Sequence, residues 1–439
     1  MAEMGKMSGG MNRRILGLAV PSVVANVTTP LLGLVDTAIT GHMGSAVYIG
    51  AISVGGVMFN MIYWLFSFLR AGTSGLAAQA WGAADKDEQA LVLYRALAVA
   101  LGAGVAMVLL QWPVLWLLRW FVDPDPVTGS LAGRYFSILI YGAPAVLGTY
   151  ALSGWFLGMQ NSRMLMVSSI VVNLVNIAVS LGLVYGAGWQ IDGVATGSLV
   201  AQWCGFGVGL WLLRRYGISR PGWGIVLRGG ELRRFFRVNL DVMLRTVCLM
   251  AVTLWFTKTG ASQGAVILAV NTLLMQLFML FSYMMDGFAF AAEALVGRYV
   301  GAKQPQEWKR GVRGVMWWGA GMAALFTLVY ILGGEAFLGV LTVDMAVIAA
   351  SKEYWLWAVT VPFAGFASFA WDGVFIGATL SRELLLSMAG AMAVFFVLEL
   401  TLFPVMGNHA LWLAFIVYLM MRGALQTWLY RRVRLFEGI

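Results

Sequence analysis

Five acidic residues lie inside long apolar stretches of the sequence, where a charged side chain would be surrounded by hydrocarbon. A charge at the middle of a bilayer costs at least about 2.5–3.5 kcal/mol, so carboxyl groups at this depth are candidates for a function. The simplest chemistry open to them is the binding and release of a proton or another cation. The residues are Asp36, Asp286, Glu293, Asp372 and Glu399.

Asp36 has polar neighbours on its own side of a helix, at steps of three or four residues. Asn26, Thr29, Gly33 and Thr40 share this face. They favour an internal polar pocket, and the alternative is a carboxylate near the outer end of the helix that reaches water without a role. We predict that Asp36 binds the coupling proton, because protonation of a semi-buried carboxylate is the simplest form of ion coupling.

A second polar stripe follows the fifth apolar stretch, where Ser169, Asn173, Asn176 and Ser180 recur at helical spacing. Such a stripe lines a cavity or forms a contact between helices, and the sequence leaves both open. We predict that Asn26, Asn173 and Asn176 surround the proton-binding carboxyl. We also assign Ser180 to the substrate cavity.

The second half of the chain carries a polar helix face formed by Ser282, Asp286 and Glu293. We assign these three residues to the substrate cavity, together with Asp36. The alternative for Asp286 and Glu293 is pairing with basic groups near the inner surface, such as Arg298.

Asp372 shares another helix face with Ser368, and it is our second candidate for ion coupling. Glu399 lies near the outer end of its helix, where it either lines the cavity or extends to water. Asp241 and Arg245 are four residues apart at the start of a helix, which favours an ion pair between them.

The elements that must position these side chains are membrane-spanning helices. Hydrophobic residues make up 60% of the chain, charged residues 11%, and the mean hydropathy is +0.81. A water-soluble domain carries about 25% charged residues. The sequence therefore predicts an all-α integral membrane protein with about twelve spans, because each span needs ~20 apolar residues. The runs lie at about 14–39, 46–69, 90–118, 134–157, 164–186, 193–213, 238–257, 265–289, 311–333, 352–376, 384–404 and 409–430.

Lysine and arginine gather in alternate connections, most densely at 214–237, where there are seven arginines. This bias places those connections and both termini in the cytoplasm. We expect a multi-pass protein of a bacterial inner membrane that contacts lipids and acts as a monomer. The net charge of +9 is spread over every inner loop, which argues against nucleic acid as a partner.

The chain matches itself without a gap when it is shifted by 219 residues. Asp125 meets Asp344, Tyr135 meets Tyr354, and the Ser-Arg pair at 162–163 meets the pair at 381–382. Each half has six spans, so both lie the same way up, and parallel repeats of this kind mark many secondary transporters. We predict two pseudo-symmetric six-helix bundles, at 1–213 and 238–439, joined by a cytoplasmic basic linker at 214–237.

Motifs of soluble enzymes are missing from the sequence. It has no nucleotide-binding Walker loop, no paired His/Cys metal spacing and no nucleophile elbow. We therefore expect no enzyme activity, no metal and no cofactor. The energy source is then an ion gradient, with the proton as the expected coupling ion and sodium as the alternative.

Four segments carry a resemblance to a known family. The run GLVDTAITGHMG at 33–44 resembles the first-helix signature of the multidrug and toxic compound extrusion (MATE) family. Three others are similar to its DinF-like subfamily: RAGTSGLAAQAWG at 70–82, NLDVMLR at 239–245 and WDGVFIG at 371–377.

The resemblance implies two six-helix lobes, a V-shaped central cavity and proton- or sodium-coupled export of bulky organic, often cationic, compounds. By position, Asp36 matches the family's proton-binding aspartate, Pro21 the proline at which the first helix bends, and Asn176 the asparagine that faces the aspartate. Asp372 resembles the acid used for cation coupling in the second lobe. Ser180 departs from the pattern, because the family often has Asp there.

We therefore expect an antiporter that exports small organic molecules by rocking of its two lobes. The deep acids should attract a cation and repel an anion. The alternative is a flippase for a lipid-linked or amphipathic anionic substrate, which would require basic residues at depth.

Overall fold

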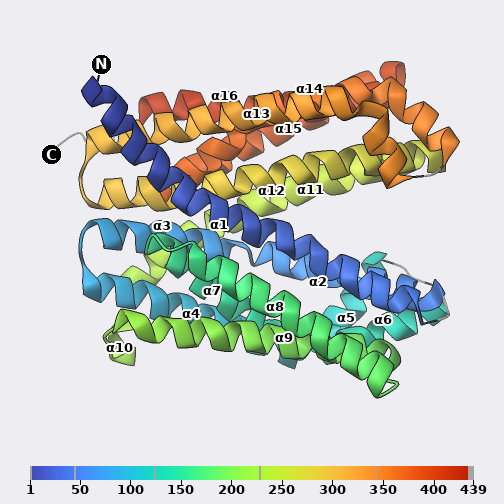
Figure 1. Ribbon diagram of the computed structural model, residues 1–439, viewed down its shortest axis with the longest axis horizontal. Helices are drawn as coiled ribbons and strands as arrows, with labels where there is room; N and C mark the ends of the chain where they lie inside the picture. The colour runs from blue at the N-terminus through green and yellow to red at the C-terminus, as the bar shows by residue number, and fades with distance from the viewer. Residues whose placement is uncertain (1, 44–45, 123–124, 227–228, 343, 434–439) are drawn as a thin grey trace. The chain divides into compact units, whose positions relative to one another are not determined.

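The computed structural model describes residues 2–43, 46–122, 125–226, 229–342 and 344–433, and all its regular elements are helices within these ranges (Figure 1). The first half contains α1 (Ala2–Gly41), α2 (Ala46–Leu65), α3 (Phe68–Gly82), α4 (Lys86–Leu109), α5 (Gln111–Val122), α6 (Pro126–Leu139), η1 (Ile140–Gly142), α7 (Ala143–Gly158), α8 (Arg163–Leu181), the π-helical turn η2 (Gly182–Gly186) and α9 (Gln190–Leu213). The rest contains η3 (Arg214–Tyr216), α10 (Trp223–Val226), α11 (Gly229–Ser262), α12 (Ala265–Gly301), α13 (Pro305–Leu341), α14 (Met345–Gly377), α15 (Ser381–Met406) and α16 (Asn408–Arg432).

Within the described residues, twelve helical segments are long and apolar enough to cross a membrane. Most are single helices. The span Val47–Gly82 joins α2 to α3, and the span Pro126–Gly158 joins α6 to α7. The predicted all-α fold with about twelve membrane-spanning helices is confirmed.

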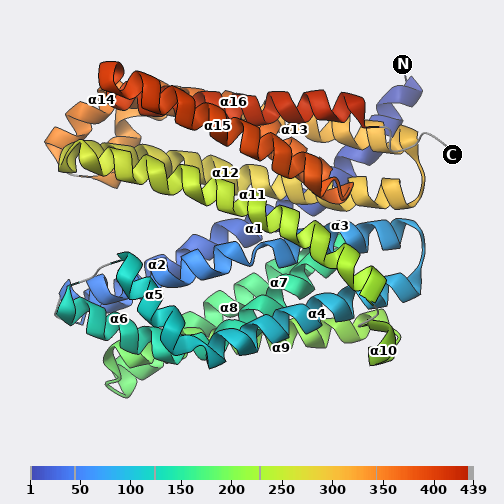
Figure 2. The same ribbon diagram turned by 180° about the vertical axis from the view of Figure 1, so that it is seen from behind.

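The chain forms two compact units (Figures 1 and 2). The first unit is Val24–Asn239, and the second unit comprises Met1–Val23 and Leu240–Ile439. The first part of α1 therefore belongs to the second unit, where Arg14 Nη1 donates to Tyr299 Oη of α12 at 3.1 Å. The predicted lobes differ in this respect, since they assign residues 1–23 to the first half.

The helix boundaries of the two halves follow the offset of 219 residues seen in the sequence. α2 begins at Ala46 and α12 at Ala265, and α7 and α14 end at Gly158 and Gly377. The backbone irregularities repeat as well, because the non-glycine residues with positive φ form pairs at the same offset. These pairs are Ala84 (56°) with Lys303 (55°), and Gln160 (63°) with Thr379 (55°).

The matching aspartates of the repeat cap matching helices. Asp125 accepts hydrogen bonds from the backbone N–H groups of Val127 and Thr128 at the start of α6. Asp344 does the same for Ala346 and Val347 at the start of α14. Each carboxylate satisfies N–H groups that have no partner within the helix. The two aspartates are therefore helix caps.

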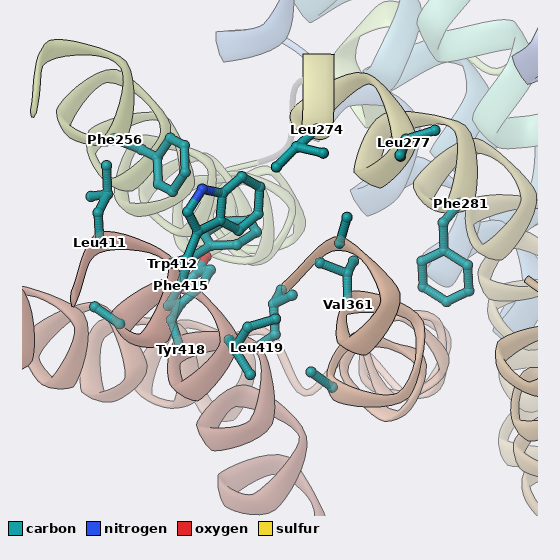
Figure 3. Close-up of a cluster of buried hydrophobic side chains, with 14 of the residues drawn as sticks. Phe256, Leu274, Leu277, Phe281, Val361, Leu411, Trp412, Phe415, Tyr418 and Leu419 are labelled. Atoms are coloured by element: carbon teal, nitrogen blue, oxygen red, sulfur yellow. The ribbon is translucent and has the colours of Figure 1, made fainter. Parts of the chain in front are cut away.

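The second unit has a core of aromatic and aliphatic side chains (Figure 3). Trp412 of α16 packs edge-on against Phe256 of α11, with ring centroids 5.1 Å apart, and its Nε1 donates to Oδ1 of Asn271 in α12 at 2.8 Å. Phe281 of α12 packs against Phe369 of α14 at 6.0 Å. The core thus joins α11, α12, α14 and α16.

Candidate functional site

Asp36 of α1 lies in a buried polar pocket of the first unit, and its side chain is only 5% exposed. Ser198 of α9 donates from Oγ to Oδ2 of Asp36 at 3.3 Å. Asn176 of α8 donates from Nδ2 to the same serine oxygen at 2.7 Å. The other carboxyl oxygen, Oδ1, is buried and has no hydrogen-bond partner among the described residues. The predicted residues Asp36 and Asn176 therefore meet through a serine that the sequence analysis did not select.

Ser198 reaches this pocket because α8 and α9 approach each other closely. A Cβ added at Gly197 would overlap Ser180, and one added at Gly205 would overlap Val172. Glycine at these contacts lets the helices pack backbone to backbone, as is common in bilayers. Ser180 is fully buried beside Gly197, and its Oγ has no partner among the described residues. Its assignment to the substrate cavity remains a prediction.

Asn173 lies at a contact between α8 and α1. Its Nδ2 donates to the carbonyl oxygens of Thr28 and Ser169 at 3.1 Å each. The hydroxyls of Thr28 and Ser169 are 2.6 Å apart. The contact of Asn173 with Thr28 therefore lies about two helical turns along α1 from Asp36, since one turn spans 3.6 residues. Here the polar stripe of α8 packs two helices together.

Three other predictions on α1 concern Asn26, Thr29 and Pro21. Nδ2 of Asn26 is buried without a hydrogen-bond partner among the described residues. The side chain of Thr29, expected on the same face, lies outside the part that the structure describes. The backbone of α1 is helical at Pro21, two residues before the helix passes from the second unit to the first. The hinge role of Pro21 remains a prediction.

Asp372 of α14 is the centre of a buried ionic network in the second unit. Arg422 of α16 donates from Nη2 to Oδ2 at 2.7 Å, and Gln426 donates from Nε2 to Oδ1 at 2.6 Å. Arg245 of α11 forms a further ion pair with Oδ2. Asp372 is 6% and Arg422 1% exposed. Two guanidinium groups therefore bind one carboxylate.

The network corrects the expected pairing of Asp241 with Arg245. Arg245 pairs with Asp372 on another helix, while Oδ2 of Asp241 accepts a hydrogen bond from Ser381 Oγ at 2.6 Å. Arg422 was not selected from the sequence because it lies in the last part of its helix, close to the basic residues of the final turn. Arg422 and Gln426 are one helical turn apart, as are Ser368 and Asp372. This matching spacing is a sequence signal that could have identified Arg422.

The remaining acids of the second unit differ in burial. Asp286 and Ser282 of α12 are half-buried, and Asp286 acts electrostatically on Arg422. Glu293, also on α12, is almost fully buried where α14 comes close at Gly377. The assignment of these three α12 residues to a substrate cavity remains a prediction.

Glu399 of α15 is 3% exposed, so its side chain does not extend to water as one expectation held. Thr259 of α11 donates from Oγ1 to Oε1 at 3.3 Å. Oε2 is buried and has no hydrogen-bond partner among the described residues. Its assignment to the substrate cavity also remains a prediction.

Comparisons with known proteins show the family and the fold of the chain. The sequence profile of the MatE family matches residues 21–181 and 239–407. DNA damage-inducible protein F of Escherichia coli is 37% identical over 94% of this chain and 91% of its own. The probable multidrug resistance protein NorM of Xanthomonas axonopodis is 27% identical over 79% of this chain and 77% of its own. The crystal structure of the Vibrio cholerae MATE transporter VcmN in the bent form covers 97% of both chains, with a TM-score of 0.87 at 15% identity.

Proposed function

The chain belongs to the MATE family of multidrug and toxic compound efflux transporters, and we propose that it is a proton-coupled antiporter that exports bulky organic, often cationic, compounds. It is a multi-pass membrane protein and, like the members of its family, a transporter rather than an enzyme.

The pocket of Asp36 is the observation that carries the proposal. Its carboxyl group is buried in a membrane-spanning helix, and its hydrogen-bond donor is the neutral hydroxyl of Ser198. Nδ2 of Asn176 in turn holds that hydroxyl. A charged carboxylate in this setting is energetically costly, and the binding of a proton removes that cost. The pocket is therefore suited to alternate between a charged and a neutral state.

Exchange of a proton for a cationic substrate follows from this alternation between the charged and the neutral state. A charged Asp36 attracts a cationic substrate by several kcal/mol at close range in a low-dielectric site. A neutral Asp36 lacks this attraction, so proton binding and cation binding oppose each other, and each lowers the affinity for the other. Protons that enter from outside would then release a cation to the outside.

Movement of the two units would give access from each side in turn. α1 contributes residues to both units, and Pro21 lies two residues before the boundary at Val23. A proline lacks the N–H for one helical hydrogen bond, so bending there is easier than elsewhere in the helix. We propose that α1 bends at Pro21 as the units rock.

The proposed setting is a bacterial inner membrane with both termini in the cytoplasm. The arginines at 214–237 support this orientation, because basic loops stay on the cytoplasmic side. The proposed partners are small organic substrates and membrane lipids, and the proposed state is a monomer.

A second candidate is a flippase or exporter of amphipathic anions. The observation that favours it is the excess of positive charge at Asp372, where Arg245 and Arg422 bind one carboxylate. An anionic head group could bind to such a site. The nearby carboxylate of Asp286 offsets part of this charge, which is why we place the cation exporter first.

Efflux from proteoliposomes tests the proposal. Purified protein is given matched cationic, neutral and anionic dyes under an imposed pH gradient, an imposed sodium gradient, or neither. We expect the pH gradient alone to drive export, with cationic dyes exported fastest. Export driven only by the sodium gradient would identify sodium as the coupling ion. Preferential export of anions would favour the second candidate.

A further inference from the structure

Glu399 is a buried carboxyl group that the proposed mechanism does not use. It lies on α15 about two turns before the end of that helix at Met406. Its contacts are one hydroxyl, from Thr259, and a second oxygen without a partner in the described part of the chain. A group of this kind is retained in a membrane helix only where its ionisation serves a purpose or a partner neutralises it.

Several charged side chains on the helices that pack near α15 have other partners. On α11, Nζ of Lys258 lies 5.3 Å from the ring centroid of Trp255 and is exposed. In the first parts of α16 and α14, Nε2 of His409 pairs with Oε1 of Glu353 at 3.1 Å. Asp241 binds Ser381, and Arg245 and Arg422 bind Asp372. Among the described residues, no ion pair neutralises Glu399.

The internal repeat relates the position of Glu399 to a position in the first unit. At the offset of 219 residues, Glu399 corresponds to Ser180 of α8, and Thr259 corresponds to Thr40 of α1. Asp36 corresponds to Trp255 of α11. The first unit thus has its carboxyl on α1 and a small serine on α8. In the second unit, Glu399 lies on α15, the helix equivalent to α8, and Trp255 stands at the position of the aspartate.

We propose that Glu399 is a second proton-binding residue, so that each unit of the transporter has its own proton site. This inference rests on the proposed function, since it adds a site to the same exchange. A proton from water adds to Oε2 and gives a neutral acid, and its release restores the carboxylate. The hydroxyl of Thr259 donates to Oε1 in the charged state, so the pocket can hold both forms.

Proton release on substrate binding tests the inference. The full-length protein in detergent is mixed with a cationic dye in weakly buffered solution, and a pH indicator reports the protons released per protein. Wild type is compared with Glu399→Gln, Asp36→Asn and the double variant. His409→Gln is the matched control, because His409 is an ionisable side chain of the same unit that pairs with Glu353.

We expect wild type and His409→Gln to release about twice as many protons as either single acid variant, and the double variant to release none, as linkage between proton and substrate requires. Full release by Glu399→Gln would overturn the inference while leaving the proposed function intact. No release by wild type would overturn both. If Glu399→Gln does not fold, Glu399→Asp retains a carboxyl and must release as many protons as wild type, and Thr259→Val must change the pH range of release.

Discussion

Arg422 donates a hydrogen bond from Nη2 to Oδ2 of Asp372 at 2.7 Å, and both side chains are buried within the helices of the second unit. An isolated charge at either position would be costly, so the two residues depend on each other. Arg245 and Gln426 complete the coordination of the carboxylate. This network joins α11, α14 and α16 and therefore bears on both stability and transport.

Arg422→Gln should destabilise the protein by about 3–5 kcal/mol, because it leaves a buried carboxylate with one cationic partner fewer. The melting temperature in detergent measures the loss. Arg134→Gln is the control, since Arg134 pairs with Asp192 at an exposed position, 65% exposed at the arginine, and such pairs contribute about 0–1 kcal/mol. Equal melting temperatures for the two variants would show that the buried pair does not stabilise the fold.

Asp372→Asn tests whether this network also takes part in coupling. The substitution leaves Arg245 and Arg422 without their common carboxylate, so we expect gradient-driven efflux to fall about tenfold, equivalent to about 1.4 kcal/mol in the transport barrier. Efflux from proteoliposomes over a range of pH and sodium concentration measures the effect. If rate and ion dependence both stay as in wild type, Asp372 is structural only.

Ser198→Ala should slow gradient-driven efflux by up to about tenfold, because a hydrogen bond to a charged group contributes about 1.5–3 kcal/mol and part of it is replaced by Asn176. Ser387→Ala is the matched control, since Ser387 is also buried and its hydroxyl donates to the carbonyl of Leu384 in its own helix. The two initial efflux rates are compared at one pH gradient. A slower rate for the control than for Ser198→Ala would contradict the assigned role.

Asp125 gives a prediction for the dependence of stability on pH. Hydrogen bonds from the side chain and backbone of Thr128 hold the pKa of Asp125 below its ordinary value of 3.8. Its charged cap therefore stabilises the folded state fully above that value, and the contribution is lost as pH falls through the lower, folded pKa. The melting temperature of wild type should exceed that of Asp125→Asn at neutral pH. This difference should shrink as pH falls below about 3.8 and disappear below the lower, folded pKa. A difference that persists in strong acid would contradict the assignment.

Much of the fold could be predicted from the sequence, because the bilayer imposes a simple length and polarity on each helix. Asp125 and Asp344 aligned in the repeat, and both cap helices. The paired positive φ angles of Gln160 and Thr379 were not predictable from residue type, since neither residue favours that conformation. Their agreement follows from the repeated backbone.

The side-chain partners were harder to predict. Ser198 is one of many serines in apolar helices, and its role depends on the close approach of α8 and α9 at Gly197. Arg245 had a sequence neighbour of opposite charge in Asp241, yet it pairs with Asp372 far along the chain. Spacing identifies which groups share a helix face, whereas the choice of partner depends on packing between helices.

The role of Asp36 is the central claim, and transport by Asp36→Asn tests it most directly. Wild type and variant are reconstituted into proteoliposomes, and cationic dye movement is measured under an imposed pH gradient and, separately, as exchange without a gradient. We predict that the variant folds and exchanges dye without a gradient, but shows no accumulation driven by the pH gradient. Accumulation by Asp36→Asn at the wild-type rate would contradict the account.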